Sequence, residues 1–102
     1  MNHHVKNYNN ISVRKEKLVK KVLLYANPTS EERRVRARIC GEEGRYVKLK
    51  RETLTIPAYS NGNFHLRMYF DRSCKMKEEV VMEIEDGEDV EELHFHMNLY
   101  ED

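Results

Sequence analysis

Residues 78–100 read EEVVMEIEDGEDVEELHFHMNLY. Two runs in this stretch alternate between apolar and polar residues, with apolar Val80, Met82 and Ile84 in the first and Leu93, Phe95, Met97 and Leu99 in the second. Asp86–Gly87, a favoured turn pair, lies between the runs. A period of two places one kind of side chain on each face of a β-strand. The stretch therefore predicts two strands with one face on a core and the other in water.

Helical spacing is the alternative for two segments. Residues 90–100 place Val90, Leu93, Met97 and Tyr100 at helical intervals, and residues 14–25 do the same with Leu18, Val22 and Tyr25. We favour a strand for the first segment because all four alternate positions of residues 93–99 are large and apolar. We also favour a strand over 19–26, with a helix as the open alternative.

The same alternation recurs along most of the chain. It predicts strands at 11–14, 19–26, 33–40, 45–51, 53–57 together with 63–70, 78–85 and 92–100. Asn27–Pro28 and Ser60–Asn61–Gly62 are turn signals between runs. We therefore expect an all-β fold, an immunoglobulin-like antiparallel β-sandwich of about seven strands. Residues 1–10 are polar and rich in asparagine, so we expect a flexible N-terminal lead-in before a sandwich domain over 11–102.

Large apolar residues at the alternating positions are the expected core. They include Phe64, Leu66, Met68, Phe70, Met82 and Phe95. These side chains fit the layer of about 10 Å between two packed sheets.

The charge of the chain is divided between its halves. The 102 residues carry 18 Lys and Arg and 18 Asp and Glu, so the formal net charge is zero. Residues 1–51 nevertheless hold 14 basic and five acidic residues, whereas residues 52–102 hold four basic and 13 acidic ones. Such halves either neutralise each other within the fold or leave a charged patch for a partner.

Basic residues at alternating positions are the candidate partner-binding residues: Arg34, Arg36, Arg38, Lys48 and Lys50. One interpretation is internal, because the third strand of such a sandwich lies beside the sixth, where Glu79, Glu83 and Glu85 occupy the polar positions. The other interpretation is a basic face, formed by the strands of residues 33–51, for an acidic peptide or an anionic surface. Nucleic acid is disfavoured, because aromatic residues that stack bases are missing from these rows.

Histidine and cysteine give only weak signals of chemistry. His94 and His96 lie two apart on one strand face and would supply two zinc ligands, with Glu83 or Glu85 as a third. We favour solvent-facing histidines and expect no metal and no cofactor. Cys40 and Cys74 are too few for a disulfide scaffold, which indicates a reducing compartment. No nucleophile motif or phosphate-binding glycine loop is present, so we expect no enzymatic activity.

Two segments resemble the major sperm protein superfamily, which includes the related domains of centrosomal and ciliary proteins. The first is VLLYANPTSEERRVRARI, residues 22–39, in which a strand ends at Asn27–Pro28 and an arginine-rich strand follows. The second is TLTIPAYSNGNFHLRMYF, residues 53–70, which is similar to the family's middle segment. A third segment, IEDGEDVEELHFHMNLY at 84–100, resembles the end of the last immunoglobulin-like domain of the nephrocystin-4 family, where an acidic turn leads to a final tyrosine.

The resemblance implies a non-enzymatic scaffold module that binds other proteins. The partners would be ciliary or centrosomal scaffold components or acidic peptides, in the cytoplasm, on the cytoskeleton or at the ciliary base. Self-association is a further alternative, because major sperm protein-like domains can polymerise. The segment that contacts peptides in the motif-binding branch of the superfamily has no match here. No stretch is apolar enough to predict a membrane span.

Overall fold

The computed structural model describes residues 3–41 and 45–101, and its regular elements are β-strands. In chain order they are β1 (His3–Arg14), β2 (Val19–Ala26), β3 (Arg33–Cys40), β4 (Val47–Leu49), β5 (Thr53–Ile56), β6 (Asn61–Met68), β7 (Lys77–Asp86) and β8 (Asp89–Tyr100). No residue in the two described ranges is α-helical. The strand prediction is therefore confirmed for both segments in which a helix was the alternative.

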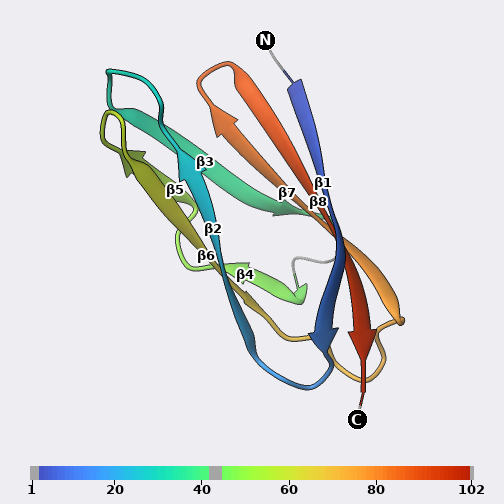
Figure 1. The fold of residues 1–102 in the computed structure, drawn as a ribbon. Coiled ribbons are helices and arrows are strands. Elements are labelled where there is room, and N and C mark those ends of the chain that lie inside the picture. Colours follow the sequence, from blue (N-terminus) through green and yellow to red (C-terminus); the bar gives the residue numbers. More distant parts are fainter. Residues whose placement is uncertain (1–2, 42–44, 102) are drawn as a thin grey trace.

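Two sheets pack face to face, as the alternating pattern predicted. The larger sheet has the order β1-β8-β7-β3-β5 and the smaller one the order β2-β6-β4. Figure 1 shows the two sheets as layers of an elongated molecule that measures 48 × 23 × 20 Å. All pairings are antiparallel except that of β1 with β8, which is parallel. The fold is an immunoglobulin-like β-sandwich.

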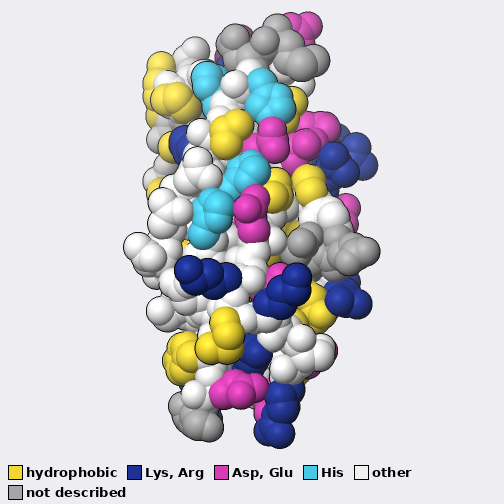
Figure 2. All heavy atoms as spheres, turned by 90° about the vertical axis from the view of Figure 1, so that its right-hand side faces the viewer, with side chains coloured by type: hydrophobic (Ala, Val, Ile, Leu, Met, Phe, Trp, Pro, Cys, Tyr) yellow, Lys and Arg dark blue, Asp and Glu magenta, His cyan; other side chains and the backbone are white. Residues whose placement is uncertain are grey.

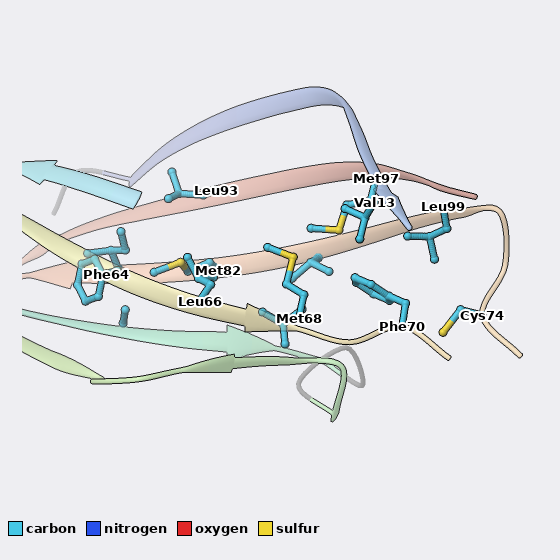
Figure 3. Close-up of a cluster of buried hydrophobic side chains, with 14 of the residues drawn as sticks. Val13, Phe64, Leu66, Met68, Phe70, Cys74, Met82, Leu93, Met97 and Leu99 are labelled. Carbon is cyan, nitrogen blue, oxygen red and sulfur yellow. The ribbon is translucent and has the colours of Figure 1, made fainter. Parts of the chain in front are cut away.

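The core lies between the sheets and consists of the predicted alternating residues. Figure 3 shows Phe64, Leu66 and Met68 of β6 between the layers, with Met82 of β7 and Leu93, Met97 and Leu99 of β8. Phe70 and Cys74 close one end of this cluster. Phe95 differs from the prediction, because it is only half-buried. Tyr8 of β1 stacks on its ring, with the ring centroids 5.2 Å apart.

The prediction of about seven strands counted 53–57 and 63–70 together, and the structure separates them. β5 pairs with β3 in the larger sheet, whereas β6 pairs with β2 and β4 in the smaller one. The chain changes sheets between them, and Asn27 holds this corner by donating from its side-chain amide to the carbonyls of Ile56 and Pro57, each at 3.1 Å. The sequence pattern misses this break because the apolar alternation continues on both sides of it.

The expected lead-in over residues 1–10 needs correction, because residues 3–10 belong to β1; residues 1 and 2 lie outside the described part. β1 pairs with β8 from His3 opposite Val90 to Arg14 opposite Tyr100. Every side chain in residues 3–10 is exposed. The segment is therefore ordered by backbone pairing at a sheet edge and not by burial, so it carries no alternating pattern. The register shifts at Asn9–Asn10, where Asn10 has a φ of 59°.

Candidate interaction surfaces

The outer face of the larger sheet carries the arginine row. Its core-facing neighbours Val35 and Ala37 are buried, so the alternation turns Arg34, Arg36 and Arg38 of β3 outward. β3 lies beside β7, as the internal interpretation required. Arg38 Nε donates to Glu83 Oε1 at 3.2 Å, and Nη2 donates to Oε2 at 3.4 Å. These contacts raise the pKa of Arg38 above its ordinary value, with the hydrogen bond to Glu83 as the main cause.

Other basic residues of β3 also face carboxylates. Arg36 lies opposite Glu85 in the register of β3 and β7. Arg33 Nη1 lies 3.2 Å from Asp86 Oδ1 at the end of β7. The internal interpretation is therefore confirmed for Arg38, which pairs with Glu83. Arg36 and Glu85 are neighbours in register, and Arg34 lies opposite Thr55 of β5. Glu79 does not belong to the β3–β7 pairing, because it lies beyond the end of β3 and contacts histidines on β8 instead.

Lys48 and Lys50 do not extend the arginine row. β4 pairs with β6 in the smaller sheet, which places Lys48 opposite Arg67. Lys50 continues the pairing with β6, because its backbone N–H donates to the His65 carbonyl at 2.9 Å. The basic stretch of residues 33–51 is therefore divided between the outer faces of the two sheets. Neighbourhood in sequence suggested one surface, but the change of sheet between β3 and β4 makes two.

A groove of about 600 Å³ crosses the outer face of the smaller sheet. Its lining residues are Lys20, Lys21, Val22, Lys48, Leu49, Lys50, His65, Leu66 and Arg67, and none of them is acidic. We call the outward side chains of Lys20, Lys48, Lys50 and Arg67 the basic face. Val22 and Leu24 of β2 lie on the same side, with 59% and 61% of their surface exposed. The surface therefore combines several cations with apolar groups that no described part of the chain covers.

Lys20 and Arg67 are members of this face that sequence reasoning did not single out. Lys21, beside Lys20, points to the other face of β2, and Arg67 is the single Lys or Arg of β6, so neither Lys20 nor Arg67 forms an alternating row along the chain. The register brings them together, because Lys20 and Lys48 both lie opposite Arg67 from the two sides of β6. The available signal was the lack of Asp and Glu in residues 19–26, 47–49 and 61–68.

Histidines and carboxylates gather on the outer side of β1, β8 and β7, where Figure 2 shows them interspersed. Glu92 is bonded by His3 of β1 through Oε2, and its Oε1 lies 3.4 Å from Nε2 of His94. His94 Nδ1 lies 2.7 Å from Glu79 Oε1. The other oxygen of Glu79 lies 3.7 Å from His96 Nδ1. Finally, His96 Nε2 lies 3.0 Å from Asn7 Oδ1 on β1. We call these six residues the histidine–glutamate chain.

The contacts in this chain shift two pKa values in opposite directions. The pKa of His94 is raised, mainly by the hydrogen bond to Glu79 and further by Glu92, against the opposing effect of burial. The pKa of Glu92 is lowered, mainly by the hydrogen bond from His3 and further by His94. Both shifts favour the charged forms, so the pairing of His94 with its two carboxylates is strongest when its imidazole is protonated.

Neither Glu83 nor Glu85, the expected third zinc ligands, lies beside His94. Glu79 and Glu92 contact His94, while Glu83 binds Arg38 and Glu85 lies further along β7. Among residues 3–41 and 45–101, no group of three or more His, Cys, Asp or Glu side chains has the geometry to hold a metal ion. Cys40 and Cys74 form no disulfide bond. His65 lies in the smaller sheet, away from the histidine–glutamate chain.

No family model matches the chain, and no curated protein matches it in sequence. The fold is similar to that of several solved structures. The Pseudomonas aeruginosa CupB2 chaperone has a TM-score of 0.68 at 7% identity, over 89% of this chain and 53% of that one. The chain thus spans about half the length of this chaperone.

Two smaller proteins match over most of their length. Caenorhabditis elegans SSP-19, an MSP-domain protein like family member, has a TM-score of 0.62 at 4% identity, over 86% of this chain and 92% of that one. PapD-like domain 7 of human CEP192 has a TM-score of 0.58 at 6% identity, over 92% and 84%. These likenesses establish the MSP- and PapD-like form of the sandwich. The described residues contain no helix of the length and apolarity that a membrane span requires.

Proposed function

We propose that the chain is a non-catalytic protein-interaction module that binds an acidic protein segment on its basic face. The observation that carries the proposal is the absence of Asp and Glu from β2, β4 and β6, the three strands of the smaller sheet. Several cations of the larger sheet are paired with carboxylates, as in Lys6–Glu91, Arg33–Asp86 and Arg38–Glu83. Lys20, Lys48, Lys50 and Arg67 form no ion pair with any residue in the described ranges.

The surface suits an acidic segment with apolar side chains. Isolated exposed ion pairs contribute little, so recognition needs several charges acting together. A face of one sign supplies this, because it steers an oppositely charged partner and disfavours basic ones. Val22 and Leu24 add apolar area beside the cations, so a partner that carries both kinds of side chain would gain from both.

The test compares two variants that each lose two positive charges. The probe is a fluorescein-labelled 14-residue peptide of alternating glutamate and leucine with flanking aspartates, followed by fluorescence anisotropy. Lys48→Gln/Arg67→Gln removes charge from the basic face. Arg34→Gln/Arg36→Gln removes the same charge from the larger sheet and is the matched control. We expect the first variant to lose at least about tenfold in affinity and the control to stay within about twofold.

Binding of the unaltered chain should weaken steeply as salt rises from 50 to 300 mM. Equal losses in the two variants would contradict the proposal, since they would indicate attraction by overall charge. The same chain is assayed on vesicles with 30% phosphatidylserine and on a DNA duplex. Tighter binding to either than to the peptide would assign the basic face to an anionic surface or to nucleic acid instead.

We further propose a setting at the ciliary base or centrosome, as one domain of a scaffold. The support is the resemblance of residues 84–100 to the nephrocystin-4 family and the fold likeness to a PapD-like domain of a human protein named CEP192. Localisation of the full-length protein, tagged and expressed in its own cell type beside a basal-body marker, tests this setting. A diffuse distribution would contradict it and would leave the binding proposal intact.

A further inference from the structure

The N-terminal half of β1 is held in place by few contacts. Residues 3–8 have no buried side chain and lie at the free edge of the larger sheet. The register shift at Asn9–Asn10 separates them from Ile11–Arg14, which follow the buried part of β8. Burial therefore contributes little to keeping residues 3–8 on β8. The polar and aromatic side-chain contacts between the two strands account for a larger share of the stability of this pairing.

Three polar contacts and one ring stack join residues 3–8 to β8. Lys6 Nζ lies 2.7 Å from Glu91 Oε1 on the face toward the smaller sheet, where Tyr8 also stacks on Phe95. The contacts His3–Glu92 and Asn7–His96 lie on the outer face and are the two ends of the histidine–glutamate chain. The chain thus begins and ends on β1 and passes through β8 and β7 between.

We propose that the histidine–glutamate chain is a pH-dependent fastening that holds residues 3–8 of β1 on the edge of β8 at mildly acidic pH and releases them as pH rises. Carboxylates alternate with imidazoles along it, so each protonated imidazole lies beside a carboxylate. His94 lies between two of them, at 2.7 Å from Glu79 and 3.4 Å from Glu92. Loss of the charge on His3 removes the ion pair between β1 and Glu92 and so weakens the hold on residues 3–8.

The neighbouring charges do not replace the imidazoles. From β7, Glu79 faces His94 and His96, while Lys77 borders the His96 end. Glu83 of β7 lies opposite Glu92, but its own cation is Arg38. From β1, His3 and Asn7 face the chain, and Lys6 points to the other side, where it pairs with Glu91. The three histidines are therefore the cations that face Glu79 and Glu92 among the described residues.

The direction of the pH dependence follows from the contact of His3 on β1 with Glu92 on β8, which is an ion pair only while the imidazole is protonated. The raised pKa of His94 acts in the same sense on the pairing of β7 with β8, because its contribution to stability is complete below the unfolded value of about 6.5 and is lost as pH rises through the folded value. Carboxylates are ionised across this range, and the pKa of Glu92 is shifted further down. Release at higher pH would uncover backbone groups along residues 90–95 of β8, where an extended segment of a partner can pair.

Amide hydrogen exchange measured by NMR at pH 6 and pH 8 tests the fastening, after correction for the intrinsic dependence of exchange on pH. We expect protection of those amides in residues 4–8 that bond to β8 to fall about two- to fivefold over this range, the change that one exposed histidine–carboxylate pair supports. The amides of β6 serve as an internal reference and should not change. The variant His3→Gln/His94→Gln keeps hydrogen-bonding groups but has no titrating charge at these positions. In this variant the ratio of corrected protection at pH 6 to that at pH 8 should be close to one.

Lys6→Gln is the matched control, because it removes a contact between the same strands on the opposite face. Its cation does not titrate between pH 6 and 8, so protection should fall equally at both values and the ratio should persist. Equal corrected protection in the unaltered chain at pH 6 and 8 would overturn the proposal. So would a ratio that survives the loss of His3 and His94.

Discussion

Replacement of Lys15 by methionine should destabilise the sandwich at the end where three segments meet. Lys15 is 7% exposed. Its ammonium group donates to the carbonyl of Cys74, which is also buried, and lies 3.5 Å from the carbonyl of Arg72. Its backbone N–H donates to the Tyr100 carbonyl at 2.9 Å. This one residue therefore joins the turn after β1, the loop before β7 and the end of β8.

The magnitude follows from the groups left behind. Methionine keeps the aliphatic stem, so the packing around the stem is preserved and only the ammonium is lost. A buried carbonyl without a donor costs about 1–3 kcal/mol. Glu101, at 4.0 Å and half-exposed, adds little. A loss of about 1–3 kcal/mol corresponds to a fall in Tm of about 5–20 °C for a domain of this size.

Urea and thermal unfolding, followed by circular dichroism, measure this loss. Lys17→Met is the matched control, because Lys17 lies in the same turn with an exposed side chain. We expect the control to stay within about 0.5 kcal/mol of the unaltered chain. If Lys15→Met proves as stable as Lys17→Met, the buried ammonium does not hold this corner, and the inference from its contacts fails.

Three further changes test the packing and the charge pairing of the two sheets. In a double-mutant cycle, the effects of Arg38→Gln and Glu83→Gln on the free energy of unfolding should be coupled at low salt and additive in 1 M NaCl. Additive effects at both salt concentrations would show that the pair does not contribute to stability. Gly62→Ala should cost about 1–3 kcal/mol in urea unfolding, because an added Cβ would lie 2.8 Å from Cγ1 and Cδ1 of the buried Ile56; unchanged stability would show that the corner repacks freely. Phe70→Ala should cost about 3–5 kcal/mol, and a cost below 1 kcal/mol would contradict its burial.

Periodicity predicts strands well where one face of the strand is buried and the other is exposed to solvent. β6, β7 and β8 meet this condition, and their core residues Leu66, Met82 and Met97 lie where the alternation placed them. The method fails for residues 3–10, because both faces of that strand are exposed and backbone pairing alone orders it. Alternation also cannot report a change of sheet, which leaves the apolar period intact between β5 and β6.

The candidate surfaces were predictable only as far as topology could be inferred. The Arg38–Glu83 pair follows from the neighbourhood of the third and sixth predicted strands, which is common to such sandwiches. Lys48 was grouped with that row because it is near in sequence, but β4 pairs with β6 on the opposite sheet. The contact of His3 with Glu92 joins two residues that are 89 positions apart in the sequence. It also depends on residues 3–10 forming a strand, which the sequence did not predict.

The position of the β7–β8 hairpin explains why a neutral chain has one basic face. Every Asp and Glu that lies in a described strand belongs to β7 or β8, and this hairpin lies between β3 and β1 in the larger sheet. Five of its carboxylates already pair with cations or imidazoles of that sheet: Glu79, Glu83, Asp86, Glu91 and Glu92. Without breaking these pairs, the hairpin of a second copy could offer the basic face only its remaining carboxylates. The acid that meets Lys20, Lys48, Lys50 and Arg67 is therefore better supplied by a different chain, and the module should sediment as a monomer at a protein concentration at which the acidic peptide is bound.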